Sequence, residues 1–107
     1  MYFGEAGSEG ALRKERQLCR EAFEAIGLAL ATLDDAAWLD VELVAVEPAP
    51  DASRLAVVVR SSGTMAPDEL ERKLEHIAGY LRSELASALQ RKRVPGLTFR
   101  IAPPEEP

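Results

Sequence analysis

Apolar residues in the first third of the chain recur at intervals of three and four, the spacing that brings side chains onto one side of an α-helix. This pattern predicts a helix over residues 12–33. Its apolar side is formed by Leu18, Cys19, Ala22, Ile26, Ala29, Leu30 and Leu33. Beyond it, Asp34 and Asp35 indicate a linker, and we expect Trp38 and Leu39 to fold back onto the core.

The middle of the chain has the pattern of two short strands. Residues 41–47, VELVAVE, and residues 53–60, SRLAVVVR, are rich in β-branched side chains. Prolines and an aspartate in residues 48–52 favour a turn, so we expect the two strands to form an antiparallel pair. The nearly continuous apolar run of the second strand indicates a strand that is covered on both sides or lies at the centre of a sheet.

A second helical region is expected to begin at Pro67, because proline suits the first turn of a helix. Acidic residues come directly after it, as the positive end of the helix dipole favours. The apolar stripe of this helix consists of Leu70, Leu74 and Ile77. Gly79 interrupts the helical pattern, and a glycine there predicts either a kink or a close approach of the backbone to another group.

Helical spacing resumes after the glycine and is followed by a third strand. The apolar positions of this part are Leu81, Leu85, Ala88 and Leu89. We expect the helix to include the basic run at residues 91–93 and to stop at Pro95 and Gly96. Residues 97–101, LTFRI, have the composition of a strand.

The order helix, strand, strand, helix, helix, strand predicts an α+β fold. Three strands are too few to close a barrel, so we expect one sheet with the helices packed on one face and much of the other face either open or used for contacts. Residues 1–10 contain three glycines and are expected to form a flexible tail. The Pro- and Glu-rich residues 103–107 are expected to be disordered, which leaves one folded domain over residues 11–102.

Charge is distributed unevenly along the chain. The net charge of the 107 residues is −5, which by itself argues against a nucleic-acid partner. Residues 11–20 and 90–101, however, together hold eight basic residues and one acidic residue, whereas residues 34–51 hold six acidic residues and no basic one. Such a chain can present a basic face despite its acidic total. The alternative is that these charge runs are only solvated surface.

Candidate catalytic and metal-ligating residues are sparse. The single cysteine, Cys19, reads as a buried structural thiol, and His76 has no partner for catalysis or metal binding. Asp34 and Asp35 are typical of a helix exit. Neither a phosphate-binding loop nor a hydrolase motif is present, so we expect no enzyme activity, no cofactor and no metal site. No signal peptide or membrane span is expected either, and cytoplasmic localisation is the default.

Three stretches of the chain resemble the ribosome-binding factor A family over about residues 12–102. They are PDASRLAVVV at residues 50–59, ERQLCREAFEAIGLALATL at residues 15–33 and AGYLRSELASALQRKRVPGLTFRI at residues 78–101. The resemblance implies a type II KH-like domain with the order α-β-β-α-kink-α-β and a three-stranded mixed sheet. It also implies a helix–kink–helix with an Ala-x-Gly signature, in which Gly79 matches and Ile77 departs.

The resemblance also implies a function. The family binds the immature small ribosomal subunit near its decoding region, contacts small-subunit rRNA, and assists late maturation and processing of the RNA 5′ end. It matters most in the cold and leaves the subunit before translation begins, with the help of a ribosome-associated GTPase. A monomer is the simplest expectation. Two alternatives remain: a generic KH-like binder of single-stranded RNA, and a protein–protein module that uses the open sheet face or an edge strand and binds no RNA.

The expected RNA-binding residues fall into three groups. At the kink, backbone N–H groups of Ala78 and Gly79 could bond a phosphate that Arg82 neutralises, although Gly79 could equally be a packing glycine. The predicted first helix carries Arg13, Lys14, Arg16 and Arg20. The third group, Arg91, Lys92 and Arg93, is expected at a helix C-terminus, where the dipole also favours positive charge.

Overall fold

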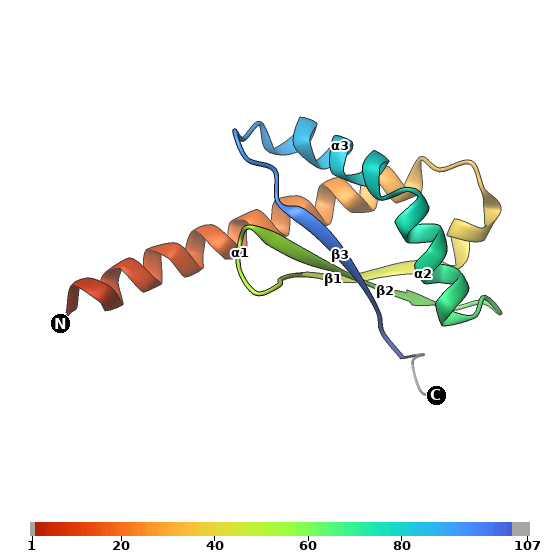
Figure 1. Cartoon of the computed structure of the whole chain (residues 1–107), viewed down its shortest axis with the longest axis horizontal. Coiled ribbons are helices and arrows are strands. Elements are labelled where there is room, and N and C mark those ends of the chain that lie inside the picture. Colours follow the sequence, from red (N-terminus) through yellow and green to blue (C-terminus); the bar gives the residue numbers. More distant parts are fainter. Residues whose placement is uncertain (1, 104–107) are drawn as a thin grey trace.

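The computed structural model describes residues 2–103 and has the predicted α+β order of elements (Figure 1). A short 3-10 helix, η1, is added to it between the first helix and the first strand. The elements are α1 (Tyr2–Ala31), η1 (Ala36–Asp40), β1 (Val41–Pro48), β2 (Arg54–Ser61), α2 (Pro67–His76), α3 (Ala78–Leu89) and β3 (Gly96–Ile101).

The three strands form one mixed sheet in the order β1-β2-β3. β1 and β2 are antiparallel, as expected from their short connection, and β3 is parallel to β2. Val57 at the middle of β2 pairs with Val46 on one side and with Phe99 on the other. β2, the strand with the most continuous apolar run, is therefore the central strand. The apolar run suits this place, because both edges and both faces of β2 are covered.

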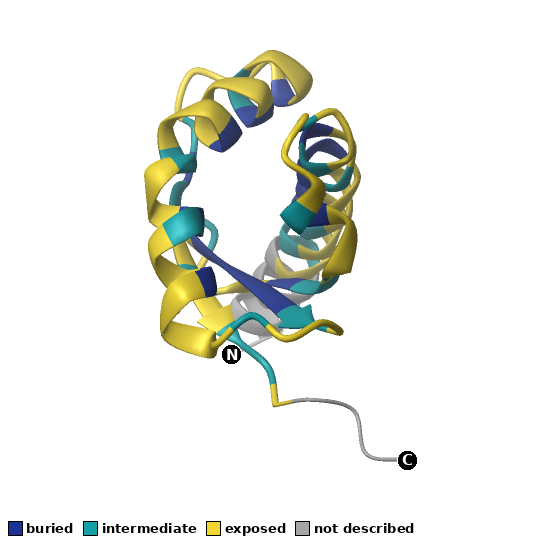
Figure 2. Ribbon diagram, turned by 90° about the vertical axis from the view of Figure 1, so that its right-hand side faces the viewer, coloured by how far each residue is buried: buried dark blue, intermediate teal, exposed yellow. Residues whose placement is uncertain are grey.

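The core lies between the sheet and the helices, which cover one face of it. Leu55, Val57 and Val59 alternate along β2, point toward the helices and are completely buried. Leucines of α2 and α3 and the apolar side of α1 meet them there. Figure 2 shows the buried positions of helices and strands turned toward this common interior. The expectation of helices on one face is thus met.

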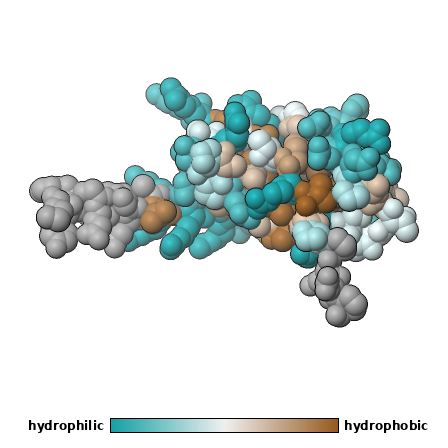
Figure 3. Space-filling view, turned by 60° about the horizontal axis from the view of Figure 1, so that its bottom comes forward, coloured by the Kyte–Doolittle hydropathy of each residue, from teal (hydrophilic) through white to brown (hydrophobic). Residues whose placement is uncertain are grey.

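The opposite face of the sheet is less open than the sequence indicates. Ala56 and Val58 point to this side, yet they are only 7% and 5% exposed. The Arg100 Nη2 atom on β3 lies 3.0 Å from Glu47 Oε1 on β1, so this ion pair spans the central strand. Seen from this underside, hydrophilic side chains flank and cross an apolar patch (Figure 3). Charged side chains therefore shield the apolar centre of this face.

The N-terminal helix is longer than its apolar pattern. α1 begins at Tyr2, so helix occupies the residues where the sequence favours a flexible tail. Once a helix is nucleated, each added residue contributes a hydrogen bond at little entropic cost, and glycines in the extension weaken it without ending it. In Figure 1 this part of α1 projects beyond the sheet. Of the C-terminal segment expected to be disordered, residues 104–107 lie outside the described residues.

Candidate nucleic-acid interface

The basic run does not belong to α3, contrary to the sequence prediction. α3 ends at Leu89, and Gln90 takes a left-handed conformation with φ 51° and ψ 43°. A left-handed residue after the last helical one turns the chain away from the helix axis, a role that glycine usually fills. Residues 91–93 consequently lie in the loop between α3 and β3 and are exposed. The positions of residues 91–93 are therefore not fixed by the helical hydrogen bonds of α3.

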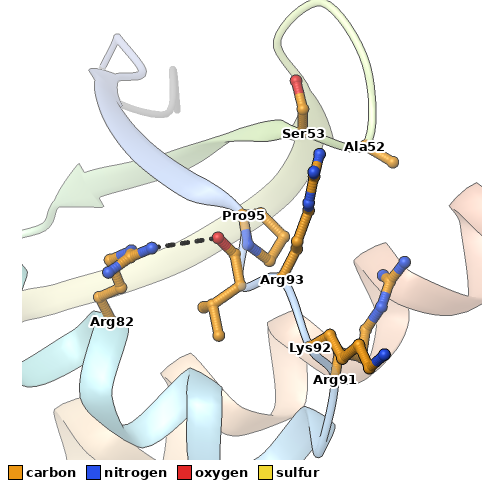
Figure 4. Close-up of a pocket in the computed structure, with 8 residues that line it drawn as sticks. Ala52, Ser53, Arg82, Arg91, Lys92, Arg93 and Pro95 are labelled. Atoms are coloured by element: carbon orange, nitrogen blue, oxygen red, sulfur yellow. Dashed lines mark hydrogen bonds between the residues drawn. The ribbon is translucent and has the colours of Figure 1, made fainter.

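This loop forms one wall of a basic cleft, which we define by Arg82, Arg91, Lys92, Arg93 and Ser53. The cleft has a volume of about 570 Å³ and lies between the α3–β3 loop and the turn that joins β1 to β2 (Figure 4). Four of its eight lining residues are basic and none is acidic. The fold thus gathers into one concave surface two groups that are separate in the sequence.

A hydrogen bond from α3 holds the loop in position. Arg82 Nη2 donates to the backbone oxygen of Val94 at 3.2 Å (Figure 4). Arg93 points from the loop toward Ser53, whereas Arg91 and Lys92 point toward the side of α1 (Figure 4). Pro95 next to them is buried, which anchors the loop further. The cations are therefore displayed from a backbone that is tied at both ends.

The turn opposite the loop has its own fixed geometry. Asp51 accepts hydrogen bonds from the backbone N–H of Ser53 at 2.9 Å and from its Oγ at 2.6 Å. These bonds favour the ionised carboxylate and lower the pKa of Asp51 below its ordinary value. Sequence reasoning missed Ser53 as part of the site. The Asp-Ala-Ser spacing, which permits such a side-chain-to-backbone turn, is the signal that could have indicated it.

α1 contributes one of its four predicted cations to this region. Lys14 and Arg91 line the same two shallow hollows beside the cleft, together with Leu18. Lys14 lies one helical turn before buried Leu18 and so shares its side of α1. Arg16 lies two residues before Leu18 and Arg20 lies two residues after it, so each side chain is roughly 200° around the helix from Leu18.

The remaining stripe of α1 is separate from the cleft. Arg13, Arg16 and Arg20 are exposed, and none of them lines the cleft or the hollows next to it. The structure therefore brings together Lys14, Arg82, Arg91, Lys92 and Arg93 and leaves the three arginines of α1 on another face.

The kink is a break of one residue between two helices. Ile77, with φ −102° and ψ 8°, ends α2 and precedes α3. Its N–H still donates to the Leu74 oxygen at 3.1 Å, and its own oxygen accepts from the Leu81 N–H at 2.9 Å. Hydrogen bonding thus continues through the bend. Ala78 is half-buried, and Gly79 is exposed in the first turn of α3.

Packing within the described chain does not require a glycine at position 79. A Cβ atom built there meets nothing within 4 Å, and the φ angle of Gly79 is not positive. The alternative of a packing glycine therefore has no support from its surroundings. The kink also lies at the far end of α3 from the basic run, since the 12 residues of α3 span roughly 18 Å. Arg82, one turn after the kink, lies between the two.

The residues considered as catalytic or metal-binding candidates either make contacts that stabilise the fold or are exposed to solvent. Asp35 Oδ1 accepts from the Ala37 N–H at 2.9 Å, which caps η1, and Asp35 Oδ2 lies 3.1 Å from Lys73 Nζ. These contacts, the backbone bond foremost, lower the pKa of Asp35. Cys19 is half-buried against the core, and burial raises the pKa of its thiol, with Glu15 and Glu47 adding to the effect. His76 is exposed.

Neither a metal-binding cluster nor a membrane span is found among residues 2–103. No group of three or more histidine, cysteine, aspartate or glutamate side chains is positioned there to hold a metal ion. Within the same range, every helix is too short or too polar to cross a bilayer.

This chain is similar to known proteins in sequence and in structure, although no family model matches it. Ribosome-binding factor A of Solibacter usitatus (strain Ellin6076) is 39% identical over 72 residues, which make up 63% of this chain and 55% of that protein. The match thus spans little more than half of the relative's length. The crystal structure of ribosome-binding factor A from Thermus thermophilus superposes with a TM-score of 0.66 at 25% identity, covering 85% of this chain and 93% of that one.

Proposed function

We propose that this chain, as a member of the ribosome-binding factor A family with a KH-like fold, is a ribosome-associated factor that acts in small-subunit biogenesis. The family and the fold, which the sequence predicts, are confirmed by the sequence relative and the structural neighbour. The role in biogenesis and the mode of RNA binding are our inference from this relationship and from the basic cleft. Immature small-subunit rRNA is the partner that we assign to the cleft.

The basic cleft is the observation that carries this proposal. Arg82, Arg91, Lys92 and Arg93 surround one cavity without an acidic neighbour in its lining. Placing like charges close together costs free energy, and a polyanion that enters the cleft reverses that cost. Arginine and lysine on a fixed backbone suit phosphate oxygens, whose neutralisation releases counterions from the nucleic acid.

The lining of the cleft favours contact with the RNA backbone over contact with bases. No aromatic side chain lines it, whereas readers of unpaired bases stack them on aromatic rings. Trp38 is buried and Phe99 is half-buried in the core, whereas the exposed rings of Phe23 and Tyr80 do not line the cleft. We therefore propose recognition of folded rRNA by shape and phosphate position, with the effect of stabilising one conformation of the immature RNA.

The finer steps of the proposed role are those that the resemblance to the family implies. They are assistance to late maturation and to 5′-end processing of the rRNA, importance in the cold, and release by a ribosome-associated GTPase. We propose that the protein does this in the cytoplasm as a monomer without a cofactor and without catalysing a reaction. Ala78 and Gly79 at the start of α3 are a second proposed phosphate contact, with Arg13, Arg16 and Arg20 as a peripheral one.

The experiment that tests this function is co-sedimentation with ribosomal particles on a sucrose gradient. We expect the protein to migrate with free small subunits, most strongly with immature ones, and to be absent from translating ribosomes. Absence from every ribosomal fraction at low salt would overturn the proposal. Binding of short unpaired oligonucleotides without preference for small subunits would instead support a generic single-stranded RNA binder.

Replacing Gly79 by alanine separates stability from RNA binding. We expect Gly79→Ala to raise the free energy of unfolding by about 0.5–1 kcal/mol, because alanine is the better helix former and its Cβ enters open space. We expect the same change to weaken rRNA binding, since a methyl group would obstruct a phosphate at the N-terminus of α3. Urea unfolding and a filter-binding titration measure the two effects.

The matched control for that substitution is Ser83→Ala, an exposed position further along α3. It should leave rRNA affinity unchanged. A loss of stability in Gly79→Ala would show that the glycine has a structural role. Unchanged affinity would remove Gly79 from the proposed interface.

A further inference from the structure

The two outer strands of the sheet differ in how regular their edges are. β1 and β3 flank the central β2, so each has one edge that pairs with no other strand of the described chain. The pairing of β1 with β2 shifts register between Leu43 and Ala45, and α1 packs against β1. β3, in contrast, pairs with β2 in unbroken register from Gly96 to Ile101. An irregular edge resists the addition of another strand, whereas a regular edge favours it.

The outer edge of β3 carries a row of backbone groups that have no partner. At one end of the strand, the Gly96 N–H donates to the Ser53 oxygen at 3.1 Å. At the other end, the Ala102 N–H donates to the Val59 oxygen at 2.7 Å. Even-numbered residues therefore direct their N–H and C=O groups toward β2, and odd-numbered residues direct theirs outward. The outward-facing residues are Leu97, Phe99 and Ile101. Within residues 2–103, no hydrogen bond outside the sheet involves their backbone groups.

The side chains at these three positions are also only partly covered. They lie beside Leu55, Val57 and Val59 of β2, which are completely buried, yet they are themselves half-buried at the border of the core. Burial of the core thus decreases from β2 toward the outer side of β3. A further strand on this side would remove more apolar area from water.

The features that commonly protect a sheet edge are missing from β3. Native edges are protected by bulges, prolines or charged side chains. Residues 96–101 contain no proline, and their one charged residue is Arg100. Its Nη2 atom lies 3.0 Å from Glu47 Oε1, so the guanidinium is directed across β2 toward β1 and away from the outer edge. Pro95 and Pro103 flank the strand, which limits an added segment to about the length of β3 itself.

An extended peptide is the ligand that complements this edge. Its backbone repeats donors and acceptors every two residues, at the spacing of roughly 6–7 Å that the outward groups of β3 also have. RNA affinity depends on phosphate contacts with cations, and within residues 96–101 the one cation is already in an ion pair.

A second copy of the chain is a less suitable occupant of the edge. β3 has six residues. Edge-to-edge pairing of two such strands would bury on the order of 200 Å² per copy, for a strand of roughly 20 Å and a sheet about 10 Å thick. A stable dimer buries about 800 Å² per partner.

We propose that the outer edge of β3 binds an extended segment of a partner protein as a fourth strand of the sheet. Apolar side chains at alternate positions of the segment cover Leu97, Phe99 and Ile101, and its backbone bonds their N–H and C=O groups. The basic cleft is formed by side chains of α3, the α3–β3 loop and the β1–β2 turn, so RNA and the protein segment use different groups. Strand binding does not depend on RNA binding, and each can be tested without the other.

The test uses the full chain and two fluorescent isomers of a short peptide of alternating valine and threonine. One isomer is methylated at every valine nitrogen and the other at every threonine nitrogen, so the isomers share composition and charge but lack N–H donors along opposite edges. We expect one isomer to bind roughly tenfold or more tightly than the other in fluorescence anisotropy, because only one keeps the N–H groups that face β3. Equal affinities, or no binding of either isomer, would overturn the proposal.

Amide exchange measured by NMR locates the bound peptide residue by residue. Binding of the tighter isomer should slow exchange at Leu97, Phe99 and Ile101 and leave Thr98 and Arg100 unchanged, since the last two amides already face β2. Protection without this alternation would contradict strand addition. Slow exchange at the three positions in the free protein, together with sedimentation as a dimer, would assign the edge to a second copy and overturn the proposal. Displacement of the peptide by small-subunit rRNA would assign the edge to RNA and overturn it as well.

Discussion

Simultaneous replacement of Arg91, Lys92 and Arg93 by alanine will remove most of the affinity for small-subunit rRNA. Each phosphate contact contributes a factor of roughly five to eight at about 0.1 M salt, so three lost contacts correspond to roughly a hundredfold or more. The slope of log K against log salt should become shallower by roughly 0.7–0.9 for each lost contact. Filter binding over a series of salt concentrations measures both quantities.

The chain offers a control variant with the same change in charge. Arg13, Arg16 and Arg20 lie outside the cleft, and their replacement by alanine also removes three positive charges. We expect this variant to lose several-fold less affinity than the variant of the α3–β3 loop. Equal losses would mean that RNA responds to total charge and not to the cleft. Unchanged binding in the loop variant would refute the assignment of the cleft.

Neither triple variant is expected to unfold. All six side chains are exposed, and the Arg82–Val94 hydrogen bond that holds the loop uses a backbone oxygen that these substitutions keep. Circular dichroism and the urea midpoint should match those of the unchanged protein. A lower affinity can then be attributed to the missing cations.

Replacement of Leu85 by alanine will strongly lower the stability of the fold. Leu85 is completely buried on the side of α3 that faces the core. Leucine-to-alanine changes at such sites cost about 2.7–5 kcal/mol, through lost burial and the cavity left behind. The total stability of a small domain is about 5–15 kcal/mol, so a large share of it would be lost. Urea unfolding followed by circular dichroism measures the difference.

Leu28→Ala is the corresponding control on the surface. Leu28 is 70% exposed on α1, and its truncation should change the free energy of unfolding by less than about 0.5 kcal/mol. A loss below about 1 kcal/mol in Leu85→Ala would mean that α3 is not packed as described. Because α3 carries Arg82 and leads into the basic loop, the Leu85 variant should also lose rRNA affinity at temperatures where it begins to unfold.

The elements that the sequence predicts well are those with a strong local pattern. Pro67 begins α2 as expected, because its fixed φ angle suits the first helical turn. The apolar run of residues 53–60 correctly indicates the central strand, since only a strand covered on both faces needs it. A break between two helices is also found close to the glycine that predicts it, at Ile77, two residues before Gly79.

The local sequence pattern does not predict where two of the helices begin or end. α3 stops at Leu89 because Gln90 adopts a left-handed conformation, and a glutamine there gives no warning of it. The helical extension to Tyr2 has no apolar stripe to reveal it, since no core lies beside that part of α1. The end of α3 and the start of α1 both depend on parts of the chain outside these two helices.

The amino-acid sequence by itself determined the α+β order of elements, the antiparallel strand pair, the kink and the identity of the basic residues, because each rests on neighbours along the chain. Only the tertiary structure decided which cations act together. Packing of Leu18 turns Lys14 toward Arg91 and leaves Arg16 on another face, while the sheet brings Ser53 opposite Arg93. Distances between segments are set by the shared core, and no single stretch of sequence contains that information.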